Sequence, residues 1–289
     1  MPYVDLADAR LFYDTAGDDG TPVLLIMGFG VPGHLWLNQI PTLATRHRVA
    51  WFDNAGAGRT LRARRRPPTM RDLGRHAIAV LDALGWPAAH VVGVSMGGMI
   101  AQEVALGHRA RIRSLTLVVT HAGGLRNLVP PPASLALFAR GFLGPRRHRV
   151  RALERLIFPD DYLRDVDVTP LRDALGEHVV AAAPAADRLR QVAAVLTHRT
   201  APRLPRLAGT PTLVVVAARD RLVRPRQTRR LHQLIPGSRL LVLADAGHAV
   251  LHQCADRLNA ALLEHFAHAD AGTAGFRLDG ARDLGSTAR

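Results

Sequence analysis

The chain has 289 residues, enough for one large domain with a sizeable core, and 48% of them are hydrophobic. Its apolar runs are all short of the roughly 18 residues that a membrane-spanning helix needs, so no membrane span is predicted. The 38 basic residues outnumber the 24 acidic ones and give a net charge of +14. Every basic residue is arginine and the arginines are scattered, which indicates compositional bias and predicts no nucleic-acid partner.

The start of the chain and its cysteine content bear on the compartment. Residues 1–5 lack the basic and apolar regions of a signal peptide. The single cysteine, Cys254, cannot form an internal disulfide, which suits a reducing environment. The sequence therefore favours a cytoplasmic protein, and it leaves the oligomeric state open.

Strands and helices alternate through the first 120 residues. The predicted elements are a hairpin of 3–6 and 10–15, strand 23–27, a helix around 35–45, strand 48–52, helix 69–84, strand 90–94, a helix from 99 to 106 and strand 114–119. Such alternation is typical of a parallel sheet with helices on both faces.

The alternation stops between about 121 and 206, where several helices are predicted, and it returns with strand 212–217, helix 225–235 and strand 239–243. After Ala267 the composition is small and polar, which predicts a mostly disordered tail. The predicted division is 1–120 for the first part of the core, 121–206 for a helical insertion, 207–267 for the second part of the core and 268–289 for the tail.

The stretch 93–97, Gly-Val-Ser-Met-Gly, joins a predicted strand to a predicted helix through a tight turn. A turn this sharp requires small residues on either side, because neighbouring backbone and Cβ atoms would otherwise collide. It would lift the Ser95 hydroxyl clear of the sheet and aim the Met96 N–H at the group that Ser95 attacks. Of the five serines in the chain, only Ser95 has this setting, so we predict it as a nucleophile.

A serine hydroxyl is a poor nucleophile at neutral pH and requires a base that is itself oriented by another group. His248 and Asp220 each follow a predicted strand. Asp220 could instead cap the next helix, and Asp245 is nearer to His248 in the sequence. Asp245 shares a short loop with His248, whereas Asp220 ends a neighbouring strand and can approach the imidazole from the side. We therefore predict Ser95, Asp220 and His248 as the catalytic residues.

These residues stand in the order Ser, Asp, His, and the chain from about Val23 to about Phe266 resembles the α/β-hydrolase family. The matching motifs are the strand and oxyanion loop at 24–30, the D-x-R-G-x-G-x-S loop at 53–60, the serine turn at 93–97, the D-x-x-x-x-P acid loop at 220–225 and the G-H pair at 247–248. Met27 stands where a loop-bracing histidine is common, and Ala55 replaces the usual arginine.

The resemblance implies an α/β fold with a mostly parallel eight-stranded sheet, flanked by helices and covered by a helical lid. It implies an oxyanion hole made by the backbone N–H groups of Phe29 and Met96. In the lid, Phe138 and Phe142 are candidates for the substrate pocket, while Asp53 is expected to hold its own loop together. No cofactor is expected, and no spacing of His, Cys and Asp residues indicates a metal site.

The sequence thus predicts a serine hydrolase that cleaves an ester or related acyl bond of a small molecule through an acyl-enzyme. Other chemistries use the same residues: carbon–carbon bond or enol-lactone hydrolysis, and perhydrolase or haloperoxidase-type activity. Aminopeptidase action would need lid carboxylates to hold the substrate amine, and the candidates are Glu154, Asp160, Asp161 and Glu177. A non-catalytic relative that binds a small ligand is the alternative from another class.

Overall fold

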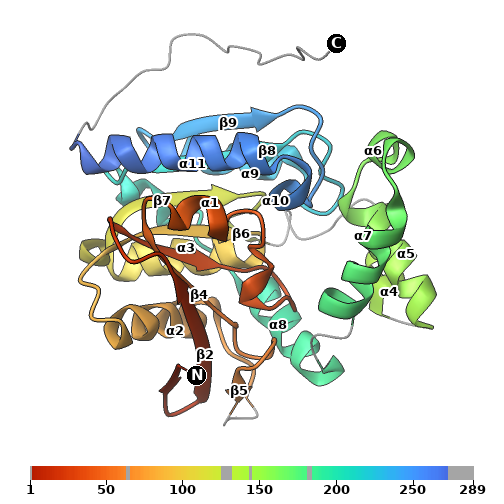
Figure 1. Cartoon of the computed structure of the whole chain (residues 1–289), viewed down its shortest axis with the longest axis horizontal. Coiled ribbons are helices and arrows are strands. Elements are labelled where there is room, and N and C mark those ends of the chain that lie inside the picture. Colours follow the sequence, from red (N-terminus) through yellow and green to blue (C-terminus); the bar gives the residue numbers. More distant parts are fainter. Residues whose placement is uncertain (1, 63–65, 125–131, 143–144, 181–183, 273–289) are drawn as a thin grey trace.

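The computed structural model describes residues 2–62, 66–124, 132–142, 145–180 and 184–272. Eight strands form one sheet in the order β1-β2-β4-β3-β6-β7-β8-β9, with β1 and β2 antiparallel to their neighbours and the others parallel (Figure 1). Their bounds are Tyr3–Asp5 (β1), Ala9–Ala16 (β2), Pro22–Ile26 (β3), Arg48–Phe52 (β4), Ala89–Val94 (β6), Ile112–Val118 (β7), Thr212–Ala217 (β8) and Arg239–Leu243 (β9), and the two-residue β5, Leu61–Arg62, pairs with β2. This is the predicted α/β-hydrolase architecture.

Helices cover both faces of the sheet because its central strands are apolar on both sides; every residue of β3, β6 and β8 is buried. One face carries α2 (Met70–Ala83), α3 (Met96–Gly107) and α9 (Pro225–Leu234). The other face carries α1 (Ile40–Ala44), α10 (Val250–Gln253) and α11 (Ala255–Asp270). The two hydrophobic cores lie between these helices and the sheet.

A group of helices, which we call the helical segment, connects β7 to β8. It comprises α4 (Pro132–Phe142), α5 (Arg146–Ile157), α6 (Asp160–Asp165), α7 (Val168–Leu175), a π-helical turn (Gly176–Val180) and α8 (Ala185–Thr197). Figure 1 shows α4–α7, in green, beyond the ends toward which β7 and β9 point. The segment has a small apolar cluster of its own. Because ligands bind at the carboxyl ends of the parallel strands in such sheets, the segment lies next to the expected ligand site.

Most predicted boundaries shift by a few residues, and two differences have a clear physical reason. The single helix predicted around 35–45 is a short 3₁₀ turn, Gly33–Leu35, followed by α1, because Pro41 is accepted only in the first turn of a helix. At the other end of the chain α11 continues to Asp270, whose carboxylate accepts hydrogen bonds from Thr21 and Arg113 and so ties the last turn to the core. Residues 273–289 of the predicted tail lie outside the described residues.

None of the helices in the described ranges combines the length and the apolar character that crossing a membrane would require.

Candidate active site

Ser95 lies between β6 and α3 in a backbone conformation that a residue with a side chain rarely adopts, with φ +54° and ψ −120°. Holding such a conformation costs on the order of 1–3 kcal/mol, and strain of this kind is concentrated at functional sites. A Cβ on Gly93 would collide with the Gly97 carbonyl oxygen, and a Cβ on Gly97 would collide with the Ile26 carbonyl oxygen. The two glycines of the motif are therefore required by close approach of the helix to the strands.

The strained turn is fixed by two hydrogen bonds to β7 and the loop after it. The Ser95 N–H donates to the Val118 carbonyl at 2.9 Å, and the Thr120 hydroxyl donates to the Ser95 carbonyl at 2.7 Å. The Thr120 carbonyl in turn accepts from the Thr228 hydroxyl of α9 at 2.9 Å. The serine turn is thus held by neighbouring elements on the carboxyl side of the sheet.

The structure brings together the three residues predicted from the sequence. His248 Nε2 lies 3.0 Å from Ser95 Oγ, and His248 Nδ1 lies 2.7 Å from Asp220 Oδ2. An ionised carboxylate can only accept, so the proton belongs on Nδ1, and Nε2 then accepts from the serine hydroxyl. The other Asp220 oxygen accepts from the N–H groups of Leu222 and Val223 at 2.8 and 2.9 Å, and the side chain is only 1% exposed.

Asp245, the alternative carboxylate, has a different partner. Both of its carboxylate oxygens accept from Arg257, at 2.7 and 2.6 Å, and its side chain is 57% exposed. The hydrogen bond from Arg257 lowers the pKa of this carboxyl below its usual value. Gln253 links the Asp245 carbonyl to the Gly247 N–H, so this loop supports the backbone just before His248.

The predicted oxyanion loop lies beside the serine. A Cβ built on Gly28 would be 3.4 Å from the Ser95 Cβ, and Gly28, Phe29 and Ser95 line the same cavity. The Met27 side chain is buried in the core, and its carbonyl accepts from Asn54 Nδ2 at 2.8 Å. The loop is therefore braced by Asn54 and does not need a histidine at position 27.

Asp53 holds two backbone segments together, as the sequence analysis expects. One of its carboxylate oxygens accepts from the Gly33 N–H and the other from the Arg59 N–H, both at 2.7 Å. The side chain is fully buried, and the Thr60 hydroxyl donates to its carbonyl. Asp53 thus joins the chain after the oxyanion loop to the loop 53–60.

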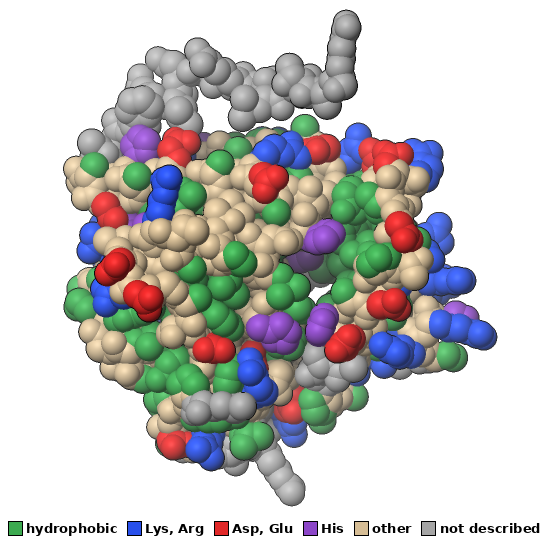
Figure 2. All heavy atoms as spheres, in the orientation of Figure 1, with side chains coloured by type: hydrophobic (Ala, Val, Ile, Leu, Met, Phe, Trp, Pro, Cys, Tyr) green, Lys and Arg blue, Asp and Glu red, His purple; other side chains and the backbone are tan. Residues whose placement is uncertain are grey.

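A cavity of about 300 Å³ opens beside Ser95 and His248, between the sheet and the helical segment. Figure 2 shows this hollow with histidine side chains around it. Phe138 lines the cavity and its ring contacts Phe29, while the side chain of Phe142 lies outside the described residues. The wall is mainly apolar. Its larger apolar residues from the helical segment are Phe138, Leu153, Leu156, Ile157, Phe158, Leu171, Leu175, Val179 and Val180. The volume is at the lower end of small-molecule sites, which run from about 300 to 1,000 Å³.

The family follows from a comparison of the chain with known proteins. The model of the family described as alpha/beta hydrolase fold matches residues 21–253. The chain belongs to the α/β-hydrolase family.

Relatives of this α/β-hydrolase include enzymes of several activities. A protein of Azorhizobium caulinodans named "Putative carbamate hydrolase RutD" is 32% identical over 266 residues, 91% of this chain and 97% of that protein. The crystal structure of the enol-lactonase from Burkholderia xenovorans LB400 matches with a TM-score of 0.79 at 24% identity, over 92% of this chain and 100% of that one. The structure of a meta-cleavage product hydrolase from Pseudomonas fluorescens IP01 matches with a TM-score of 0.77 at 25% identity, over 90% of this chain and 95% of that one. Family and relatives together identify the protein as a hydrolase.

Gln191 is a site residue of this α/β-hydrolase that the sequence analysis missed. It lies on α8 and is fully buried. Its Oε1 accepts from the Gly30 N–H at 2.7 Å, and its Nε2 donates to the Ala55 carbonyl at 3.0 Å. A glutamine within an amphipathic helix carries no signal of such a role, which is apparent only once α8 is seen against the oxyanion loop.

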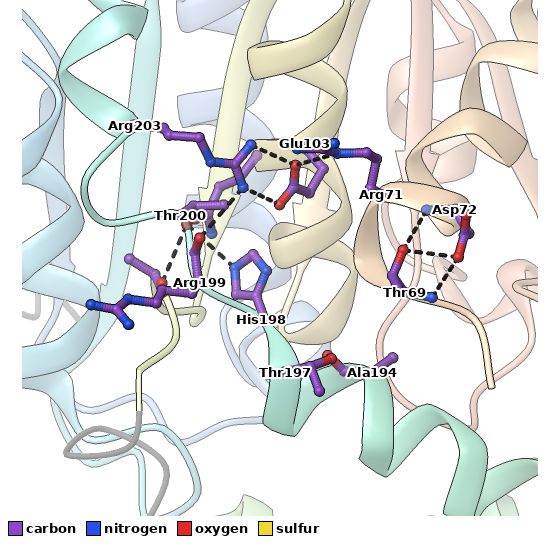
Figure 3. A network of polar contacts seen from close by, with 12 residues as sticks. Thr69, Arg71, Asp72, Glu103, Ala194, Thr197, His198, Arg199, Thr200 and Arg203 are labelled. Atoms are coloured by element: carbon purple, nitrogen blue, oxygen red, sulfur yellow. Dashed lines mark hydrogen bonds and ion pairs between the residues drawn. The ribbon is translucent and has the colours of Figure 1, made fainter.

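The chain after α8 is attached to the helix that follows the serine (Figure 3). Arg203 donates to both carboxylate oxygens of Glu103 on α3, at 2.9 and 2.5 Å. The Thr200 hydroxyl donates to Gln102 of the same helix at 2.5 Å. These contacts fix the end of the helical segment to the element that presents Ser95.

The acidic residues of the helical segment do not line the cavity. Glu154 accepts from Arg172 at 2.6 and 3.0 Å, Asp160 accepts from Arg221, and Asp161 accepts from Arg219. Glu177 is also absent from the described cavity wall. The site therefore offers none of the four candidate carboxylates to a substrate amine, which argues against aminopeptidase action.

Across the described residues, no group of three or more His, Cys, Asp and Glu side chains is arranged to hold a metal ion.

Proposed function

We propose that the protein is a serine hydrolase that cleaves an ester or related acyl bond of a small molecule. The observation that carries the proposal is the continuous hydrogen-bonded chain from Asp220 through His248 to Ser95, which ends in an apolar cavity. Carbamates, named in the A. caulinodans relative, also present an acyl carbonyl to a nucleophile. Acyl transfer is therefore the chemistry that accounts for both the geometry and that name.

In the first half of the reaction, the Ser95 oxygen attacks the acyl carbonyl while His248 Nε2 takes the hydroxyl proton. Asp220 keeps the imidazole in the tautomer that can accept this proton and stabilises the imidazolium that forms. Met96 is the first residue of α3, and the first N–H groups of a helix have no partner within it. Its N–H and that of Phe29 are the proposed donors to the oxyanion.

The first half ends when the imidazolium gives its proton to the leaving group, whose bond to the acyl carbon breaks, and the acyl group remains on Ser95. A water molecule then loses a proton to His248 and attacks the acyl-enzyme, which releases the acid and restores the serine. Phe138 and the neighbouring apolar side chains would hold the acyl group, so the helical segment would set substrate size as a lid.

A fluorophosphonate probe tests the proposal, because it forms a covalent bond only with an activated serine. Wild type and Ser238→Ala, which changes a serine that does not line the cavity, should both be labelled. Ser95→Ala should not be labelled, and its ester turnover should fall on the order of 10³-fold or more. Labelling that persists in Ser95→Ala would reject the nucleophile, and folded wild type without labelling would favour a ligand-binding protein.

A further inference from the structure

Two arginines of the helical segment, Arg149 on α5 and Arg188 on α8, are part of the otherwise apolar wall of the active-site cavity. Both donate to one oxygen, the Val180 carbonyl, Arg149 at 3.1 Å and Arg188 at 3.3 Å. Their guanidinium groups are therefore neighbours. The stem of Arg188 also passes the oxyanion loop, since a Cβ on Gly30 would be 3.9 Å from its Cγ and Cδ.

Two like charges side by side in a half-buried, apolar setting repel each other and lose hydration. Burial and the charge of Arg149 accordingly lower the pKa of Arg188. Within the described residues Arg149 donates to carbonyl oxygens only, those of Gly141 and Val180, so its charge is not balanced by a carboxylate.

Four other arginines on or beside the helical segment are each paired with a carboxylate. The pairs are Arg172 with Glu154, Arg190 with Asp187, Arg219 with Asp161 and Arg221 with Asp160. Arg149 differs from these four because it lines the cavity and, within the described residues, has no acidic partner. A bound anion would offset the repulsion between the two guanidinium groups, and a planar carboxylate suits their fork of donors.

We propose that Arg149 and Arg188 form a carboxylate-binding subsite, so that the preferred substrate is a small acyl compound with an apolar body and a carboxylate. The inference rests on the proposed function, because it places the subsite in the cavity of Ser95. It narrows the substrate class from esters in general to anionic ones.

Pairs of esters that differ only in the carboxylate test the subsite. One pair places it in the acyl part, mono-p-nitrophenyl glutarate against p-nitrophenyl valerate; the other places it in the alcohol part, 4-acetoxybenzoate against 4-acetoxybenzamide. In wild type, at least one pair should show a higher kcat/KM for the anionic member. The ratio should fall on the order of 10- to 100-fold in Arg188→Met, the scale of a charge-assisted hydrogen bond.

Arg149→Met should lower the same ratio of kcat/KM values, and Arg188→Lys should keep part of the ratio that Arg188→Met loses. With three variants, the test does not depend on the folding of any one of them. The control is Arg151→Met, which removes the same charge from an exposed position of α5 outside the cavity wall and should leave the ratio as in wild type. Ratios near one for both pairs in wild type, or ratios that the Arg188 and Arg149 variants do not change, would overturn the subsite while ester turnover upholds the function. Absence of any turnover and of probe labelling in folded protein would overturn both.

Discussion

The sheet edge and the helical segment supply different parts of the same site. At the sheet edge, short stretches of backbone at the ends of β6 and β8 and in the loop after β9 fix Ser95, Asp220 and His248 within hydrogen-bonding distance of one another. The helical segment has its own small apolar cluster and reaches the core through individual polar contacts such as that of Gln191. On the proposed function, the chemistry would depend on backbone geometry in the core, and substrate choice on side chains of the helical segment.

The largest effect should come from the core. Asp220→Asn keeps an oxygen for the N–H groups of Leu222 and Val223 but no longer stabilises the imidazolium of His248. Ester turnover should fall on the order of 10³- to 10⁴-fold while the melting temperature changes little. Steady-state kinetics and thermal unfolding measure the two quantities.

Asp245→Asn is the matched control for this carboxylate. It breaks an exposed ion pair with Arg257, and such pairs contribute little to stability or geometry. Turnover should stay within about threefold of wild type, since surface substitutions have small effects. If Asp245→Asn were inactive and Asp220→Asn active, Asp245 would be the carboxylate that orients His248.

A smaller effect should come from the contact between the two regions. Gln191→Leu removes the acceptor for the Gly30 N–H and the donor to the Ala55 carbonyl. The oxyanion loop would lose its support from α8, and kcat should fall about 10-fold, less than the loss of an oxyanion donor itself. Gln191→Glu retains the acceptor for Gly30 and should lose less of kcat.

Gln191 could position the oxyanion loop for catalysis or only stabilise the fold. The rate of fluorophosphonate labelling, measured well below the unfolding temperature, distinguishes these two roles. A Gln191→Leu protein that melts earlier but is labelled and turns over at the wild-type rate would show that the contact serves stability alone. The helical segment would then act on the substrate only through the cavity wall.

The last prediction concerns stability and pH and leaves turnover at neutral pH unchanged. Burial lowers the pKa of His90, His121 and His265 to about 4 and that of His198 to about 3. In the unfolded chain these four histidines are exposed and take up a proton near the ordinary histidine pKa of about 6.5. The stability that these neutral histidines contribute is therefore fully present above about pH 6.5 and is lost progressively as the pH drops toward 4.

Urea unfolding at a series of pH values between about 7 and 4.5 measures this dependence. His198 lies where the helical segment rejoins the core, and His198→Asn should reduce the slope by up to one proton. A free energy of unfolding that stays constant over this range in wild type would contradict the burial of neutral histidines.

The core site could be predicted because its signals are local. The glycines at 93 and 97 are dictated by steric contact, and Asp220 and His248 each follow an apolar strand, so topology alone brings them to one edge. Gln191 and Arg188 could not be found this way. Their contacts with the oxyanion loop depend on where α8 packs against residues more than 100 positions away in the sequence, and nothing in a helical pattern fixes that packing.

The ends of the helices, too, could be predicted only where a nearby residue in the sequence determines them. The break in the predicted helix around 35–45 follows from Pro41, a signal that is visible in the sequence. The continuation of α11 to Asp270 follows from long-range hydrogen bonds to Thr21 and Arg113, which local composition does not indicate.

Trapping the intermediate shows whether Ser95 forms an acyl-enzyme. Wild type is mixed with p-nitrophenyl butyrate, quenched in acid within the first turnovers, digested and analysed by peptide mass. We expect a butyryl group on the peptide that contains Ser95, and none in Ser95→Ala treated in the same way. A butyryl group on another residue, or release of p-nitrophenol by Ser95→Ala at the wild-type rate, would contradict it.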